Sequence, residues 1–228
     1  MIKLQRFNRL PHLKQWLPLS IVATLLALGA GFLGTNPSIL ASEFKVDQKL
    51  NSMGAHTLPA IAKFASEIYS PKFAIILTLV MVVAIWLIGK SLFDGLAFAL
   101  TVAFGWLPAE FFKIMFNEPR PDVAKLSHFV LAQETDTSYP SGHVCFAVAF
   151  GFALFYLLRQ TKAKWFAVAF WVVSVVVEAW ARLFVGAHYL NDIFGSLCTT
   201  FVGVMVFAYL WNKYVSERIQ ETKFFHLN

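Results

Sequence analysis

Long apolar runs are the feature of this sequence that most constrains its fold. The chain of 228 residues is 58% hydrophobic and only 14% charged, whereas an ordinary soluble domain carries about 25% charged residues. Several runs with almost no charge reach the roughly 18 to 20 residues that a helix needs to cross a bilayer. The sequence therefore predicts an integral membrane protein, and its length fits one domain over residues 1–228.

Six apolar runs are interpreted as membrane-spanning helices. They cover residues 17–33, 73–88, 92–112, 143–158, 165–181 and 193–211. The first follows a basic segment but is long for a signal peptide and lacks a clear cleavage site, so we expect an uncleaved signal anchor. Pro108 lies in the third run and is expected to kink it. The expected fold class is all-α, a bundle of six transmembrane helices.

The segment between the first two runs contains an amphipathic stretch. Leu58, Ile61, Phe64, Ala65 and Ile68 recur at helical spacing. This pattern is typical of a helix that lies on the membrane surface or across the top of a bundle. We expect this helix on the extracytoplasmic side. The sequence leaves open whether it only caps the bundle or also gates the entry of a lipid.

Basic residues in the loops indicate the orientation of the chain. With six spans, both termini share one side with the turns near Lys90 and Arg159–Lys164, and that side carries eleven Lys and Arg residues. The opposite side carries eight, of which three belong to the motifs described below. We therefore expect a multi-pass protein of the plasma membrane, with both termini cytoplasmic and the motifs on the extracytoplasmic face.

The positive charge and the cysteines are explained without further partners. A formal net charge of +6 can indicate nucleic-acid binding, but no long basic block is present, so cytoplasmic loops and an anion site account for it better. Cys145 and Cys198 both fall in apolar runs, where we expect small buried hydrophobic side chains, with a disulfide as the alternative. No nucleic acid and no obligate protein partner are inferred.

The first motif is KIMFNEPRP, which runs from Lys113 to Pro121 at the end of the third apolar run. Arginine offers a planar fork of donors that suits phosphate oxygens, and lysine adds a mobile point charge. Pro119 and Pro121 flank Arg120 and stiffen its backbone. The alternative is a lysine that snorkels and an arginine that sits near lipid headgroups.

The second motif is PSGH, residues 140–143, directly before the fourth apolar run. The free N–H groups and dipole of a helix N-terminus attract anions. Ser141 can either cap that helix or donate its hydroxyl to a phosphate oxygen, and Gly142 permits close backbone approach. The reference pKa of histidine, about 6.5, suits His143 as a general acid. The alternative is a serine cap with an interfacial histidine.

The third motif contains Arg182, His188 and Asp192. The last two are four residues apart, so they share one face if the sixth helix begins near Gly186. An aspartate in that position can accept the imidazole N–H and leave the other ring nitrogen free to attack. Arg182 ends the preceding run and can reach the same pocket. For Asp192 alone, stabilisation of the helix dipole is the alternative.

Metal binding was weighed as a second chemistry for these residues. Two histidines and one aspartate can ligate zinc, but the sequence has no HxxxH or HExxH pair. The nearby cations would also disfavour a divalent metal ion. The sequence therefore predicts a phosphate-ester site that needs no metal and no cofactor.

Taken together, the three motifs resemble the type 2 phosphatidic acid phosphatase superfamily of membrane lipid phosphatases. Its signature K-x6-R-P, P-S-G-H and S-R-x5-H-x3-D is matched in order and spacing between Lys113 and Asp192. The resemblance implies that His188 is a nucleophile that forms a phosphohistidine, that Asp192 orients it, and that His143 protonates the leaving group. Lys113, Arg120, Ser141, Gly142 and Arg182 would hold the phosphate oxygens.

One position departs from this signature, because Ala181 stands where the family usually has serine. The change puts an accessory hydrogen bond in doubt but not the nucleophile. The short loops are similar to those of bacterial members that act on undecaprenyl diphosphate or phosphatidylglycerophosphate, and phosphatidic acid is a further candidate. The expected function is hydrolysis of such a lipid phosphate. A phosphotransferase and a non-catalytic lipid-phosphate binding or transport protein are the alternatives.

Overall fold

The computed structural model describes residues 7, 10–11, 13–54, 57–131 and 134–216. All regular elements in these ranges are helical, as the sequence predicts. The α-helices are α1 (Leu13–Leu33), α2 (Pro37–Ser52), α3 (Leu58–Ile68), α4 (Pro71–Gly89), α5 (Leu92–Trp106), α6 (Pro108–Phe116), α7 (Gly142–Leu158), α8 (Lys164–Phe184) and α9 (Leu190–Trp211). Two short elements complete the fold, a 3-10 turn, η1 (Val123–Lys125), and a π-helical turn, η2 (Asn212–Ser216).

Five stretches of the described chain are long and apolar enough to cross a bilayer. They are Gln15–Leu33, Pro71–Gly89, Leu92–Phe116, Lys164–Phe184 and Leu190–Val215. The prediction of a membrane-spanning helical protein is therefore confirmed. The sixth predicted span, residues 143–158, corresponds to α7, whose 17 residues make a shorter apolar helix. At 1.5 Å per residue, α7 is about 26 Å long against a hydrocarbon core of about 30 Å, so six spans stay a prediction.

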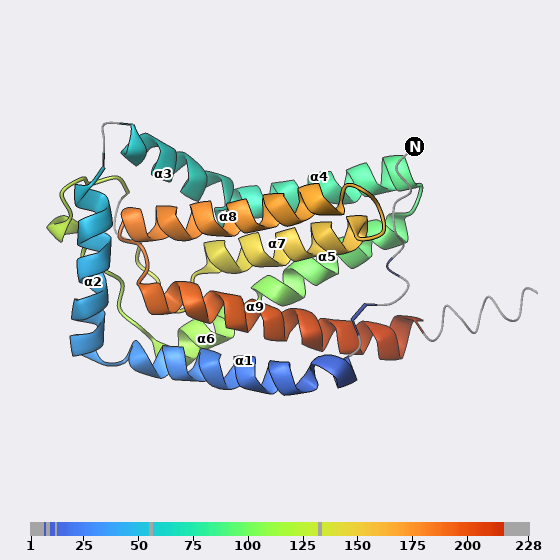
Figure 1. Cartoon of the computed structure of the whole chain (residues 1–228), viewed down its shortest axis with the longest axis horizontal. Helices are drawn as coiled ribbons and strands as arrows, with labels where there is room; N and C mark the ends of the chain where they lie inside the picture. The colour runs from blue at the N-terminus through green and yellow to red at the C-terminus, as the bar shows by residue number, and fades with distance from the viewer. Residues whose placement is uncertain (1–6, 8–9, 12, 55–56, 132–133, 217–228) are drawn as a thin grey trace, which may run out of the picture.

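The long helices run side by side along the longest axis of the molecule (Figure 1). α1 packs against α9, α7 packs against α8, and α5 contacts α4, α7 and α9. α2 is oriented across one end of this bundle, at the left of the view. The loops that join α4 to α5 and α7 to α8 lie at the opposite end. α2 therefore covers one end of the bundle, and these two loops form the other.

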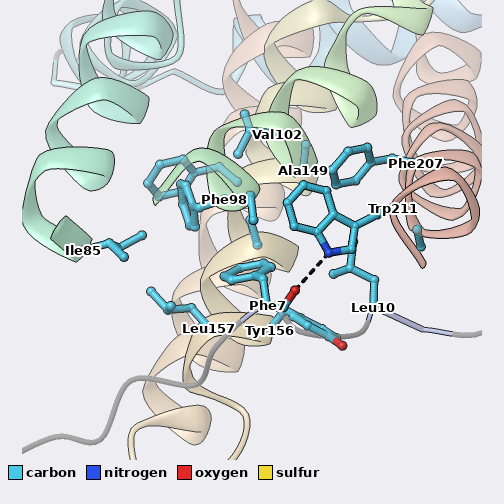
Figure 2. Packing of buried hydrophobic residues seen from close by; sticks show 14 of the residues in the cluster. Phe7, Leu10, Ile85, Phe98, Val102, Ala149, Tyr156, Leu157, Phe207 and Trp211 are labelled. Carbon is cyan, nitrogen blue, oxygen red and sulfur yellow. Dashed lines mark hydrogen bonds between the residues drawn. The ribbon is translucent and has the colours of Figure 1, made fainter. Parts of the chain in front are cut away.

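Aromatic side chains form the core at the end away from α2 (Figure 2). Phe98, Tyr156 and Phe207 are buried there and come from α5, α7 and α9. Trp211 donates its indole N–H to the backbone oxygen of Phe7 at 2.9 Å. This contact joins the two ends of the described chain at one end of the bundle. Lys3, Arg6, Arg9, Arg218 and Lys223, which support the predicted orientation, lie outside the described residues.

Pro108 interrupts the third apolar run as predicted. α5 ends at Trp106 and α6 begins at Pro108, because proline has no N–H with which to continue the helical hydrogen-bond ladder. α6 ends at Phe116, and the next residue, Asn117, adopts a left-handed conformation with φ of 46°. This turn directs the chain into the long connection to α7, which carries part of the site described below.

α2 is a helix that the sequence analysis did not identify. Asn36 caps it by accepting a hydrogen bond from the backbone N–H of Ser38, and Pro37 occupies its first turn. Near its end, Asn51 is fully buried. The Asn51 amide donates to the backbone oxygens of His128 and Phe184, both at 2.9 Å. α2 is thereby fixed to the long connection and to the end of α8.

The amphipathic stretch forms α3, as predicted. Ala62 and Ala65 are buried against Ala181 and Phe184 of α8, while the side chain of Phe64 is 68% exposed. The helix therefore packs on α8 with its small residues and presents its large apolar residues outward. Its placement on the extracytoplasmic side, like the orientation of the termini, stays a prediction.

Candidate functional site

Residues from all three motifs line one cavity of about 580 Å³. The motif residues in its wall are Lys113, Arg120, Gly142, His143, Arg182 and His188. They come from the end of α6, the loop after it, the start of α7, the end of α8 and the loop before α9. The remaining walls include Lys63 and Ser66 of α3. The sequence prediction that the three motifs converge is correct, and α3 takes part in the site.

His188 and Asp192 form the hydrogen-bonded pair that the sequence predicts. The Nδ1 atom of His188 lies 3.0 Å from Oδ2 of Asp192, and both side chains are at most 1% exposed. The predicted helix start near Gly186 is wrong, however. α9 begins at Leu190, and Gly186 adopts a left-handed conformation with φ of 66°, so His188 lies in a turn that precedes the helix.

The contacts of His188 define which ring nitrogen carries the proton. Arg120 Nη1 lies 3.1 Å from the Nε2 atom of His188. A guanidinium group can only donate, so Nε2 accepts. The proton of the neutral ring is then on Nδ1, from which it is donated to Asp192. The lone pair of Nε2 is therefore directed toward Arg120, and both residues line the cavity.

The surroundings of His188 also keep its ring neutral. Burial lowers the pKa of His188 well below its usual 6.5, and the positive charges of Arg120, Arg182 and Lys113 lower it further. A neutral imidazole has a free lone pair, whereas an imidazolium ion does not. The site therefore favours the form of His188 that can act as a nucleophile.

The three motif cations are paired with two carboxylates that the sequence analysis missed. Arg120 Nη2 lies 2.7 Å from Oδ1 of Asp136 and 2.7 Å from Oε2 of Glu134. Lys113 also forms an ion pair with Asp136, and Arg182 with Glu134. Both carboxylates lie in the connection that precedes α7. Their oxygens accept from the same N–H groups that are predicted to bind phosphate oxygens.

Asp136 remains ionised in this arrangement. Burial would raise its pKa, but the hydrogen bond from Lys113 and the charge of Arg120 outweigh burial and lower it below 3.8. The only signal in the sequence is that Glu134 and Asp136 lie between the first and second motifs. That signal does not predict contact, because the connection from residue 117 to 141 has little regular structure to fix its path.

The start of α7 differs in part from what the sequence predicts. Ser141 is the N-cap residue, but its side chain makes no capping hydrogen bond, so that option is wrong. Its hydroxyl is buried without a hydrogen-bond partner among the described residues. His143 lines the cavity and forms a hydrogen bond with the backbone of Ser66 in α3. The phosphate-binding roles of Ser141 and Gly142 stay predictions.

Ala181, which replaces the serine of the resembled signature, does not line the cavity. It is fully buried in the cluster that contains Ala62 and Ala65 of α3. A methyl group in this position packs against the small residues of α3. The substitution therefore matches the tight packing of α3 on α8 rather than any change in the cavity wall.

Two further polar residues reach Asp192 from behind the cavity. Ser138 donates its hydroxyl to Oδ2 of Asp192 at 2.5 Å. Glu118 is 1% exposed, and its carboxyl group lies close to that of Asp192. Neither was identified from the sequence. Glu118 lies inside the first motif, between its two cations, and Ser138 lies two positions before the second motif.

The same side chains do not form a recognisable metal site in the described part of the chain. Among the residues that the structure describes, no group of three or more His, Cys, Asp or Glu side chains has an arrangement that could hold a metal ion. Lys113, Arg120 and Arg182 supply the positive charge around the cavity. Independence from metal ions stays a prediction.

Comparison with known proteins identifies relatives of the same kind. The model of the PAP2 superfamily matches residues 94–216. The chain is 28% identical over 175 residues to the undecaprenyl-diphosphatase BcrC of Bacillus subtilis (strain 168), covering 73% of this chain and 83% of that protein. It is 29% identical over 150 residues to the putative undecaprenyl-diphosphatase YbjG of Escherichia coli (strain K12), covering 63% and 71%.

A solved structure supports the fold. The chain is similar, with a TM-score of 0.72 and 16% identity, to the crystal structure of a transmembrane PAP2-type phosphatidylglycerolphosphate phosphatase from Bacillus subtilis. The similarity covers 86% of this chain and 96% of that structure. At this level of identity the match concerns the arrangement of the helices.

Proposed function

This chain belongs to the PAP2 superfamily, and we therefore propose that it is a membrane phosphatase that hydrolyses a lipid phosphate or diphosphate through a phosphohistidine at His188. The observation that supports this most directly is the setting of His188. Its Nδ1 atom is held by Asp192, and its Nε2 atom is beside Arg120 at the cavity wall. An oriented neutral imidazole next to phosphate-binding cations is the arrangement that nucleophilic attack on phosphorus requires.

In the first step, Nε2 of His188 attacks the terminal phosphorus of the bound lipid. The bond between phosphorus and the ester or bridging oxygen breaks. His143, whose protonated form is favoured by the negative charge of the bound phosphate, gives its proton to the departing oxygen. The positive charge that develops on the His188 ring is stabilised by Asp192, as in other histidine–aspartate pairs. Lys113, Arg120 and Arg182 stabilise the charge that spreads over the phosphoryl oxygens.

In the second step, water attacks the phosphorus of the phosphohistidine. His143, which lost its proton in the first step, takes a proton from that water, and the P–N bond breaks to release inorganic phosphate. Before either step, the substrate must displace Glu134 and Asp136 from the motif cations. Ser141 and Gly142 are proposed to donate to the remaining phosphate oxygens from the start of α7.

Undecaprenyl diphosphate is the first candidate substrate. It is the substrate in the names of both sequence relatives, and the cavity of about 580 Å³ has room for a diphosphate headgroup. Phosphatidylglycerophosphate, named for the solved relative, and phosphatidic acid are the further candidates. We propose that the headgroup enters from the extracytoplasmic interface while the lipid tail stays between the helices.

Phosphate release by the purified, detergent-solubilised protein tests this proposal. The lipid panel contains undecaprenyl diphosphate, undecaprenyl monophosphate, phosphatidylglycerophosphate and phosphatidic acid, assayed in EDTA. His188→Gln keeps much of the side-chain volume, and we expect it to reduce turnover by at least about a thousandfold. His128→Gln is the matched control, because His128 lies outside the cavity wall.

Each outcome bears on a separate part of the proposal. An acid-labile phosphoryl label on the wild-type protein that is missing in His188→Gln would support the phosphohistidine. Full activity of His188→Gln would exclude His188 as the nucleophile, and loss of wild-type activity in EDTA would exclude the metal-free mechanism. A label on His188 without phosphate release would indicate transfer to an acceptor other than water.

A further inference from the structure

Glu118 is an acidic residue inside the first motif that none of the proposed steps uses. It lies two positions before Arg120, yet its side chain is 1% exposed and does not line the cavity. The backbone oxygen of Glu118 accepts a hydrogen bond from the N–H of Ser138 at 2.8 Å. A Cβ atom at Gly34, in the turn after α1, would overlap the Glu118 carboxyl group. Glu118 therefore fills space that is open only because residue 34 is glycine.

Glu118 has no counter-charge within hydrogen-bonding range among the residues that the structure describes. None of the ion pairs formed by the described residues includes it. One of its oxygens, Oε2, accepts a hydrogen bond from the side-chain amide of Asn191 at 3.3 Å. The other, Oε1, is buried and has no partner when the group is treated as a carboxylate. An ionised carboxylate in such a site would be strongly disfavoured.

The protonation state of Glu118 follows from this burial. Burial raises its pKa to about 10, and the nearby negative charge of Asp192 adds to the effect. At neutral pH Glu118 therefore carries a proton, and its hydroxyl is a hydrogen-bond donor. A buried donor needs an acceptor, since an unsatisfied one is costly.

The acceptor is available on Asp192. Its Oδ2 atom already accepts from His188 Nδ1 at 3.0 Å, from Ser138 Oγ at 2.5 Å and from the backbone N–H of Tyr189 at 2.9 Å. Its Oδ1 atom is buried and lacks a donor when Glu118 is treated as ionised. Glu118 and Asp192 are close enough for a hydrogen bond between their carboxyl groups. Two carboxyl groups can form such a bond only if one of them is protonated.

We propose that Glu118 is a positioning residue for the reaction, which donates its carboxylic O–H to Oδ1 of Asp192 and holds that carboxylate in the orientation that binds His188. The inference rests on the proposed function, because it concerns the support of the proposed nucleophile. The neutral donor also stabilises the negative charge of Asp192 without adding a second charge beside it. Glu118 thus extends the His188–Asp192 pair by one residue, away from the cavity.

Two substitutions separate a donor from a negative charge. In Glu118→Gln, the amide N–H can donate to Oδ1 of Asp192 while the amide oxygen accepts from Asn191. Glu118→Met has a similar length but no donor. We expect Glu118→Met to lower kcat by about 10- to 100-fold with little change in KM, because Glu118 does not touch the substrate. Glu118→Gln should restore most of that loss.

Asp47→Asn is the matched control for removal of a buried acid. Asp47 lies in α2, is fully buried and has no hydrogen-bond partner for either oxygen among the described residues. Burial raises its pKa to about 9, with a contribution from the charge of Asp192. It is therefore also neutral at pH 7, but it is not placed on Asp192, so Asp47→Asn should keep the wild-type kcat.

Infrared difference spectroscopy gives a readout that is independent of turnover. The wild-type minus Glu118→Gln spectrum should contain the C=O stretching band of a protonated carboxylic acid. A carboxylate band in its place would overturn the inference, and so would a kcat for Glu118→Met equal to that of the wild type. Equal losses in Glu118→Gln and Glu118→Met, with thermal transitions like that of the wild type, would also overturn it. If the wild type shows no His188-dependent phosphate release, the proposed function fails, while the spectrum still tests the proton on Glu118.

Discussion

Arg120 Nη1 lies 3.1 Å from Nε2 of His188 and 2.6 Å from the backbone oxygen of Ala187. The arginine of the first motif is thus fixed on the turn that carries the histidine of the third motif, although 68 positions separate the two in the sequence. This contact sets the tautomer of His188 and brings the guanidinium group that is proposed to bind phosphate next to the proposed nucleophile.

The pH dependence of the reaction should reflect the neutral form of His188. Burial and the charges of Arg120, Arg182 and Lys113 lower the pKa of His188, so its lone pair stays available as the pH falls below the usual histidine value of 6.5. The acid limb of kcat/KM, which reports the free enzyme, should therefore lie well below pH 6.5. A limb at or above 6.5 in a full pH–rate profile would contradict the assigned environment.

Arg120→Lys should reduce kcat/KM although the positive charge is kept. Lysine cannot reproduce the fork that contacts Asp136, the backbone of Ala187 and His188, and it offers no bidentate donor pair to phosphate. We expect a loss of about 100-fold, which is typical when one stabilising donor of an active site is removed.

Lys125→Arg is the control for an exchange between the two basic residues. Lys125 is exposed and pairs only with Asp122 at 3.1 Å among the ion pairs of the described chain. Its kinetic constants should be those of the wild type. Wild-type kinetics for Arg120→Lys as well would mean that Arg120 serves as an interfacial anchor and not as a phosphate ligand.

Asp136→Asn should strengthen the binding of inorganic phosphate. Asp136 is ionised and occupies Lys113 and Arg120 in the absence of substrate, so an incoming anion must displace it. Ion pairs of half-exposed side chains contribute little individually, and we expect the inhibition constant of phosphate to fall by about two- to tenfold.

Asp122→Asn provides the comparison, because Asp122 is exposed and pairs with Lys125 outside the cavity. Its inhibition constant should not change. An increase in the inhibition constant for Asp136→Asn would show that Asp136 orients the two cations instead of competing for them.

Gly195→Ala should disturb the site through Tyr139. A Cβ atom at Gly195 in α9 would overlap the ring of Tyr139, which is fully buried, donates its hydroxyl to the backbone oxygen of Ala27 and directly precedes the second motif. Overpacking of this kind costs about 1–3 kcal/mol. We expect a lower thermal transition in detergent and a lower kcat.

Gly29→Ala is the matched substitution in another apolar helix. A Cβ atom at Gly29 in α1 meets nothing within 4 Å, and alanine favours helix by about 1 kcal/mol over glycine. The thermal transition should stay the same or rise. A Gly195→Ala protein as stable and active as Gly29→Ala would mean that the packing of Tyr139 does not support the second motif.

Local patterns in the sequence were sufficient for five of the six predicted spans and for six of the residues that line the cavity. Hydropathy located five stretches that the structure confirms, because a segment that must satisfy its backbone inside a membrane has to be a continuous apolar helix. The motifs marked His188, Asp192 and Arg120 because ionisable groups at the ends of such helices are rare. The kink at Pro108 also followed from the chemistry of one residue.

Contacts between distant segments could not be predicted in this way. The pairing of Arg182 with Glu134, the packing of Asn51 on the end of α8 and the placement of Ser138 behind Asp192 all depend on the path of irregular connections. No periodic pattern specifies that path. The start of α9 at Leu190, and not near Gly186, could not be predicted either. Gly186 is left-handed, and the Asp192 side chain accepts from the backbone N–H of Tyr189, so the helix begins after His188.

Hydrophobic length and residue chemistry are properties of single segments, so they were enough to indicate a membrane-embedded helical protein with a cationic, histidine-containing site. Which atoms of that site face each other depends on how the segments pack in three dimensions. The tertiary structure placed Arg120 on Nε2 of His188 and directed the neighbouring Glu118 the other way, toward Asp192. The physical reason is that the cost of burying a charge depends on every group packed around it, and those groups come from all parts of the chain.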